Sequence, residues 1–139
     1  MTINEIQDEI IEEFSLFDEW MDKYQYIIDL GKDLPLIDDR YKVNETLIRG
    51  CQSRVWLQAD RDNGHVVFTA DSDAIITKGI IALLIRVLSH QSPEDIAEAD
   101  LYFIDRIGLK EHLSPTRSNG LVSMIKQMKA FGTALQAKS

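Results

Sequence analysis

The stretch IRGCQSRVWL, residues 48–57, contains the single cysteine of the chain, Cys51. Gly50 precedes the thiol, the polar residues Gln52 and Ser53 follow it, and an apolar run begins only after them. Free cysteines are among the most buried residue types, so a lone one is often a small core residue. A glycine neighbour, however, gives the backbone freedom that a functional loop needs. The local pattern is therefore compatible with both a core residue and a reactive thiol in a loop.

Several kinds of thiol chemistry need partners that the sequence does not offer. A cysteine hydrolase needs a histidine base, and none of His65, His90 and His112 stands in a recognisable signature. We expect no metal site, because no close-spaced pair of ligands accompanies the cysteine. An iron–sulfur cluster needs several thiolates, and a disulfide exchange centre needs a second cysteine. What remains is a thiol that accepts a group from the sulfur of a partner and passes it on.

Length and charge limit the choice of partner. The 139 residues are enough for one domain, 1–139, with a core that needs no disulfide or structural metal. The net charge of −8 makes nucleic acid and anionic membrane surfaces poor partners. The first residues, MTINEIQDEIIEE, are acidic and do not resemble a signal peptide, and no apolar run is long enough to span a bilayer. We expect a soluble cytoplasmic protein whose thiol stays reduced.

The order of elements predicts an α+β fold, in which helices pack on a small antiparallel sheet. Asn63-Gly64 is a strong signal for a hairpin turn between two strands. The hydrophobic residues of one helix wrap nearly all round it, which indicates a central, buried element. Ser15 is the expected N-cap of the second helix. We predict strands over 53–60 and 65–70, and helices over 3–13, 15–31, 75–89, from 92, over 101–109 and over 117–137.

The acidic turn Asp71-Ser72-Asp73 precedes the predicted central helix. Such residues commonly cap a helix, because their side chains accept hydrogen bonds from its free N–H groups. We expect this role for Ser72 or Asp73. The functional alternative places the turn beside the cysteine, where it would contact a partner protein.

Three separated motifs together resemble the SufE family of sulfur acceptors: GCQSRVWL at 50–57, DSDAIITKG at 71–79 and HLSPTRSNGL at 112–121. The resemblance implies the compact α+β fold shared with iron–sulfur scaffold proteins of the IscU type. It also implies that a cysteine desulfurase, which uses pyridoxal phosphate, donates persulfide sulfur to Cys51. The chain would stimulate that enzyme and deliver the sulfur to an iron–sulfur scaffold or another acceptor. It would bind no cofactor itself, and a homodimer is conceivable.

In this interpretation Cys51 is the reacting residue, and the residues expected to support it or to contact the partner are Arg49, Gly50, Gln52, Ser53, Asp71, Asp73 and Arg117. Positive charge from Arg49, Arg54 or Arg117 would favour the thiolate, although solvated surface charge explains the first two equally well. A persulfide needs shelter, so we also expect a small apolar pocket for the Cys51 side chain. Candidates for its lining are Val55, Leu57 and Ile76.

Three other functions stay open at this point. The chain is alternatively an adaptor for a desulfurase that serves another pathway, such as tRNA modification. It is alternatively an interaction module that docks on a desulfurase and never carries sulfur. A thiol enzyme, such as a peroxidase or hydrolase, is the third, and the lack of a paired cysteine or a convincing base argues against it.

Overall fold

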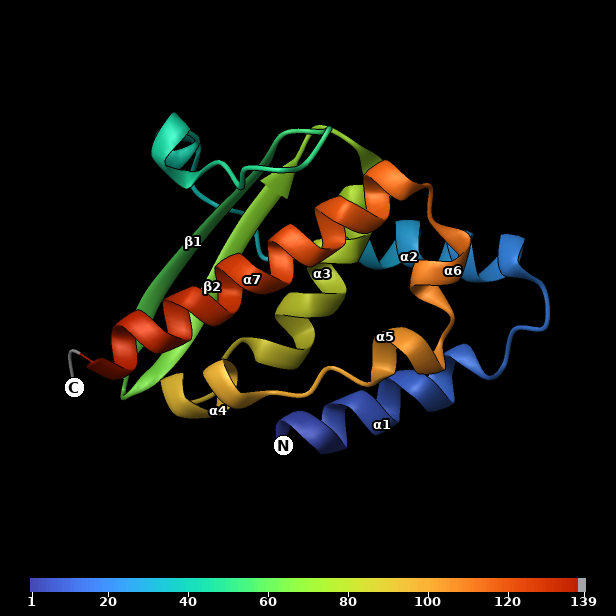
Figure 1. The fold of residues 1–139 in the computed structure, drawn as a ribbon, viewed down its shortest axis with the longest axis horizontal. Helices are drawn as coiled ribbons and strands as arrows, with labels where there is room; N and C mark the ends of the chain where they lie inside the picture. Colours follow the sequence, from blue (N-terminus) through green and yellow to red (C-terminus); the bar gives the residue numbers. More distant parts are fainter. Residues whose placement is uncertain (138–139) are drawn as a thin grey trace.

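The computed structural model describes residues 1–137, and their helices and strands form the α+β domain that the sequence predicts. Figure 1 shows α7 crossing in front of α3 and the hairpin. The elements in chain order are α1 (Ile3–Phe14), α2 (Trp20–Gly31), two 3₁₀ turns (Asp39–Tyr41 and Asn44–Thr46), β1 (Val55–Asp62), β2 (His65–Ser72), α3 (Ile75–Leu88), α4 (Pro93–Glu98), α5 (Phe103–Arg106), α6 (Leu109–His112) and α7 (Pro115–Ala137).

The two strands form the predicted antiparallel hairpin. Asn63 and Gly64 connect them, with φ of 52° and 82°. Two successive left-handed residues are what a two-residue hairpin turn requires, and asparagine and glycine adopt this conformation most readily. The register pairs Val55 with Ser72 at the open end. Each strand therefore ends two residues later than predicted, and Ser72 belongs to the sheet.

Short segments cover the outer edge of β2 at two places. Ala70 donates its N–H to the carbonyl of Pro35 and accepts from Ile37, both at 3.0 Å. Val66 makes the same kind of contact with the chain after α3, and its N–H lies 2.9 Å from the carbonyl of Gln91. On the outer edge of β1, residues 47 and 48 pair with the first residues of the strand.

The central helix α3 is buried, as its sequence predicts. Ten of its fourteen residues are buried, among them Gly79. A Cβ atom on Gly79 would lie only 2.1 Å from the carbonyl oxygen of Ile27 in α2. The backbones of α2 and α3 therefore pack directly against each other, and this contact fixes one wall of the core. None of the helices within residues 1–137 is long and apolar enough to cross a membrane.

The predicted start of the second helix is wrong. The N–H of Ser15 donates to Ile11, and its hydroxyl donates to the carbonyl of Glu12, so Ser15 closes α1. Helix α2 begins only at Trp20, without a side-chain cap. Tyr26 of α2 packs against the ring of Phe14 at a centroid distance of 5.1 Å. This tertiary contact, which sequence spacing does not reveal, joins the two helices.

A cluster of charges joins α1 to α3. Arg86 donates to Glu13 at 2.9 Å and to Glu9 at 2.8 Å, and the hydroxyl of Tyr26 also donates to Glu13. These hydrogen bonds, those from Arg86 above all, hold the pKa of Glu13 below its usual value. The ionised form of Glu13 therefore stabilises the fold.

Helix α7 begins at residue 115, two residues before the predicted start. Leu121 and Met128 are buried, and Ile125 is partly buried. The inner face also includes Met124 and Gly120, which the sequence prediction missed. Gly120 lies where α7 passes the cysteine.

Candidate functional site

Cys51 lies half-buried between the sheet and α7, in the segment 48–54 that we call the thiol loop. Its S–H donates to the carbonyl of Gly120 in α7, at a sulfur–oxygen distance of 3.6 Å. A Cβ atom on Gly120 would lie 3.4 Å from the sulfur, in ordinary contact. The sulfur therefore rests on the helix backbone at a position where a side chain larger than a methyl group would displace it.

Gly50 has two reasons to be a glycine. Its φ of 91° is in the left-handed region, which other residues enter only with strain. A Cβ atom at this position would also lie 2.5 Å from the hydroxyl of Ser123 in α7. The structure thus shows two features that only a glycine allows, the unusual backbone conformation and the close approach of another segment. Both features allow the thiol loop to pack closely against α7.

The acidic turn lies beside the thiol loop and holds its end. The N–H of Arg54 donates to the Asp73 carboxylate at 3.0 Å, and the Ser72 hydroxyl donates to the Arg54 carbonyl at 2.8 Å. The predicted capping of α3 is wrong, because this helix follows Ala74 without a side-chain cap hydrogen bond. The reason is the longer β2, which brings Ser72 opposite Val55 and turns these side chains toward the loop.

Asp71 has a local structural role. Its carboxylate forms ion pairs with Lys42 at 2.6 Å and Lys78 at 3.3 Å. The ammonium of Lys42 also lies 5.5 Å from the ring centre of Trp56. Only 14% of the Asp71 side chain is exposed, so this residue ties β2 to α3 and to the 3₁₀ turns. Of the two predicted aspartates, Asp73 is the exposed one.

Cys51 borders two spaces of different size. The inner cavity measures about 50 Å³ and lies between the thiol loop, α3 and α7. The outer hollow measures about 360 Å³ and is formed by residues 44–54. A small cavity does lie beside the sulfur, but the prediction of an apolar lining is wrong, because most of the residues around it are polar. Val55, Leu57 and Ile76 are absent from it, and the residues that line it with Cys51 are Gln52, Ser53, Thr77, Ile80, Thr116, Arg117, Gly120 and Met124.

Burial raises the pKa of the Cys51 thiol above its usual value. The resting arrangement therefore favours the protonated thiol, which is the weaker nucleophile. This direction is opposite to the one that the arginine hypothesis requires. Arg49 and Arg54 are exposed, and Arg117 lines the inner cavity while its guanidinium donates to the Tyr24 hydroxyl at 3.3 Å. A position with less burial would favour thiolate formation.

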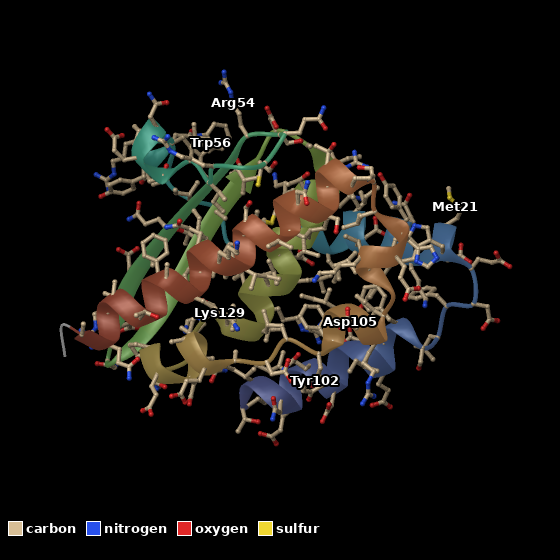
Figure 2. All side chains as sticks on the ribbon, viewed as in Figure 1. Met21, Arg54, Trp56, Tyr102, Asp105 and Lys129 are labelled. Atoms are coloured by element: carbon tan, nitrogen blue, oxygen red, sulfur yellow. The ribbon has the colours of Figure 1, made fainter. Side chains whose placement is uncertain are left out.

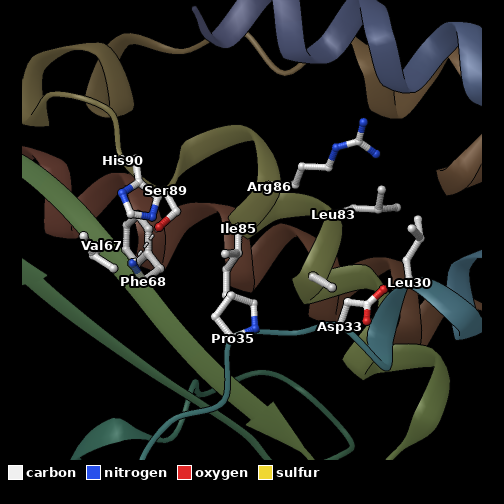
Figure 3. Close-up of a pocket in the computed structure, with 11 residues that line it drawn as sticks. Leu30, Asp33, Pro35, Val67, Phe68, Leu83, Ile85, Arg86, Ser89 and His90 are labelled. Carbon is white, nitrogen blue, oxygen red and sulfur yellow. Dashed lines mark hydrogen bonds between the residues drawn. The ribbon is translucent and has the colours of Figure 1, made fainter. Parts of the chain in front are cut away.

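A second, largely apolar cavity of about 400 Å³ lies between α3, β2 and the end of α2 (Figure 3). The Ser89 hydroxyl accepts a hydrogen bond from the Phe68 N–H at its wall, and His90 also lines it. No residue of the thiol loop takes part in this lining. The space is therefore separate from the cysteine site.

The histidines do not provide a base for Cys51. His112 stacks on Trp20 at a centroid distance of 4.3 Å, and neither His65 nor His90 lines the spaces that border the sulfur. Within residues 1–137, no group of three or more histidine, cysteine, aspartate or glutamate side chains is placed to hold a metal ion. The site as described is a lone thiol with a small adjoining cavity.

Sequence reasoning named Arg117 of α7 but missed the other residues that this helix contributes to the site. Gly120, Ser123 and Met124 all approach the thiol loop, although they follow Cys51 by about seventy residues. The one signal in the sequence is Gly120 itself, in the third motif, because a glycine inside a helix often marks close packing. Its partner across the contact is visible only in the structure.

Comparison with known proteins gives consistent matches along most of the chain. Residues 8–131 match the family profile described as "SufE: Fe-S metabolism associated domain". A SufE-like protein of Rhizobium meliloti is 39% identical over 128 residues, which cover 88% of this chain and 91% of the relative. A SufE-like protein of Rhizobium etli is 40% identical over 127 residues, which cover 88% of this chain and 86% of the relative. The solution structure of a hypothetical protein from Thermus thermophilus superposes on this chain with a TM-score of 0.78. The match covers 95% of this chain and 96% of the Thermus protein at 22% sequence identity, and it supports the fold.

Proposed function

The chain belongs to the SufE family, whose domain is associated with iron–sulfur metabolism, and from this premise we propose that Cys51 is a carrier of persulfide sulfur. A cysteine desulfurase donates the sulfur, and an iron–sulfur assembly scaffold or another acceptor receives it. The donor uses pyridoxal phosphate to release sulfur from cysteine, and this chain takes no part in that step. By removing the persulfide, the chain also speeds the turnover of the donor.

The transfer is a thiol exchange that needs no oxidant. The Cys51 thiolate attacks the terminal sulfur of the donor's persulfide, and a new sulfur–sulfur bond forms at Cys51. The bond between the two donor sulfurs breaks at the same time. The donor's cysteine leaves as a thiolate and takes up the proton that Cys51 has lost. The product is a persulfide on Cys51, and the numbers of atoms and electrons are unchanged.

The observation that carries the proposal is the inner cavity beside the sulfur. A water molecule occupies about 30 Å³ in the liquid, and a sulfur atom is of similar size. A space of about 50 Å³ therefore has room for one additional sulfur atom. Ile80 and Met124 supply the apolar part of its wall.

The raised pKa of Cys51 supports a division between a resting and a reacting position. At rest the thiol is protonated and hydrogen-bonded to Gly120, so it is a poor nucleophile. During transfer the thiol loop has to leave α7 so that the sulfur reaches the donor. Gly50 stands at the bend of this loop and is the natural pivot.

We further propose that the exposed residues around the thiol contact the donor. Arg49, Gln52, Asp73 and Arg117 are exposed, and all lie in or next to the thiol loop. Ser53 is half-buried, lines the inner cavity and supports the loop from inside.

Mass spectrometry tests the proposal directly. The chain is incubated with a cysteine desulfurase and cysteine, and a gain of one sulfur atom is expected at Cys51. The Cys51→Ser variant should gain no mass and should no longer stimulate the desulfurase. Full stimulation by Cys51→Ser would instead support a docking module that never carries sulfur. If Cys51 stays unmodified beside an enzyme whose own cysteine is loaded, the carrier proposal is wrong.

A further inference from the structure

Most cations with an ion pair lie away from the thiol loop. The ion-paired cations are Lys32, Arg40, Lys42, Lys78 and Arg86. Arg49, Arg54 and Lys126, in contrast, are exposed, and no carboxylate of residues 1–137 lies within 4.0 Å of their charged groups. Figure 2 shows the Arg54 side chain extending outward from the end of the loop. Other exposed cations, among them Arg61 and Lys110, also lack an ion pair, so the position of Arg49 and Lys126 beside the thiol loop is what distinguishes them.

Two of these cations share a groove between residues 44–49 and α7. This outer groove measures about 490 Å³ and is lined by Arg49 from one side and Lys126 from the other. Ser123 and Gln127 of α7 add hydrogen-bond donors, and Glu45 contributes a single carboxylate. The groove is thus polar and carries a net positive charge.

The outer groove is continuous with the cysteine site. Its wall at Asn44 and at residues 47–49 is also a wall of the hollow that contains Cys51. The groove and the thiol therefore lie on the two sides of one short stretch of chain. A partner segment that binds in the groove would therefore also contact the thiol loop.

We propose that the sulfur donor presents an acidic segment that lies in the outer groove, with carboxylates paired to Arg49 and Lys126. This inference rests on the proposed function, and it adds the chemistry of the partner surface. An acidic protein that must meet another protein gains speed and orientation from a local patch of opposite charge. Nucleic acid is the other anionic candidate, but the remaining negative charge of the chain repels a long polyanion.

The first test uses a peptide of six glutamates as the probe and therefore does not depend on the donor enzyme. At low salt, the peptide should shift the backbone amide resonances of residues 44–49 and 123–130 of the whole chain. The shifts should disappear in the double variant Arg49→Glu/Lys126→Glu. They should persist in the control Arg61→Glu/Lys110→Glu, which has the same charge and reverses two exposed cations elsewhere. Arg61 lies near the hairpin turn, at the end of β1 that is far from the thiol loop.

The outcomes of this test separate the alternatives. Absence of shifts at the groove, or shifts that survive in Arg49→Glu/Lys126→Glu, would overturn the inference. Tighter binding of a single-stranded decanucleotide at the same residues would assign the groove to nucleic acid and would also overturn it. Urea unfolding of both double variants confirms that any loss reflects charge and not misfolding.

The second test measures sulfur loading of Cys51 as a function of the concentration of this chain. In Arg49→Glu/Lys126→Glu, the concentration needed for half-maximal loading should rise about tenfold at low salt, with the maximal rate retained. Added salt should reduce the difference, because it screens the exposed charges. Normal loading with an unchanged half-maximal concentration would refute the docking inference alone. Failure of the wild-type chain to load would refute the proposed function, while the peptide experiment would still decide the chemistry of the groove.

Discussion

Replacing Gly120 by alanine separates the stability of the resting site from its capacity to hold a second sulfur. The new Cβ would lie 3.4 Å from the Cys51 sulfur and 3.8 Å from its Cα and Cβ, which are ordinary contact distances. The reduced protein should therefore accept the methyl group. Alanine is also better than glycine inside a helix by about 1 kcal/mol. We expect the free energy of unfolding to stay constant or to rise by up to that amount.

The same methyl group should fill the space that the persulfide needs. A methyl group is about as large as a water molecule, which takes about 30 Å³ of the liquid. Little of the inner cavity, about 50 Å³ in volume, would then remain. A persulfide in the resting position would have to leave its preferred rotamer at a cost of about 1 kcal/mol. Its population there would fall roughly fivefold, and its lifetime would shorten accordingly.

Two measurements on Gly120→Ala test this reasoning. Urea unfolding gives the stability, and mass spectrometry follows the loss of the Cys51 persulfide in the presence of glutathione. Thr133→Ala is the matched control, because it improves helix propensity in α7 at an exposed position away from the inner cavity. A persulfide that lasts as long in Gly120→Ala as in the wild type would refute the role of the cavity. A destabilised reduced protein would refute the contact geometry.

Two further predictions concern the thiol loop and the charge cluster. Gly50→Ala and Gly64→Ala both place alanine at a positive φ, but only the new side chain at residue 50 meets an atom within 4 Å. Urea unfolding should therefore show Gly50→Ala to be less stable than Gly64→Ala by about 1–2 kcal/mol. Iodoacetamide should also alkylate Cys51 faster in Gly50→Ala. Because the pKa of Glu13 is lowered in the folded state, its contribution is complete above the unfolded pKa of about 4.3 and is lost as the pH falls through the folded value. Urea unfolding should therefore show that the stability of the wild type declines below roughly pH 4, and that the decline is smaller in Arg86→Met. An equal decline in both proteins would contradict the stabilising role of the Glu13–Arg86 pair.

The sequence was informative wherever structure depends on neighbouring residues. Asn63-Gly64 specifies its own turn geometry, and Pro93 after Ser92 specifies a helix start, which the Ser92 hydroxyl caps by accepting from the N–H of Asp95. The burial of α3 also follows from composition alone. These features need no knowledge of the rest of the fold.

Prediction failed where a distant segment competes for the same polar group. Ser72 and Asp73 have the side chains of helix caps, yet the paired strand directs them to the backbone of Arg54. The cavity beside Cys51 was expected from the chemistry of a persulfide, but its walls belong mainly to α3 and α7. Sequence patterns show that a residue is apolar, and only the packing of helices decides which apolar residues meet the sulfur.

The covered edges of the hairpin have a consequence for the behaviour of the protein in concentrated solution. A two-stranded sheet with free edges would be a template for strand addition by a second molecule. In this fold the segments around Pro35 and Gln91 occupy the outer edge of β2, and Ile48 binds the start of β1. The rest of β1 ends in charged residues, Asp60, Arg61 and Asp62. We therefore expect the chain to resist fibril formation while the thiol loop is in its resting position.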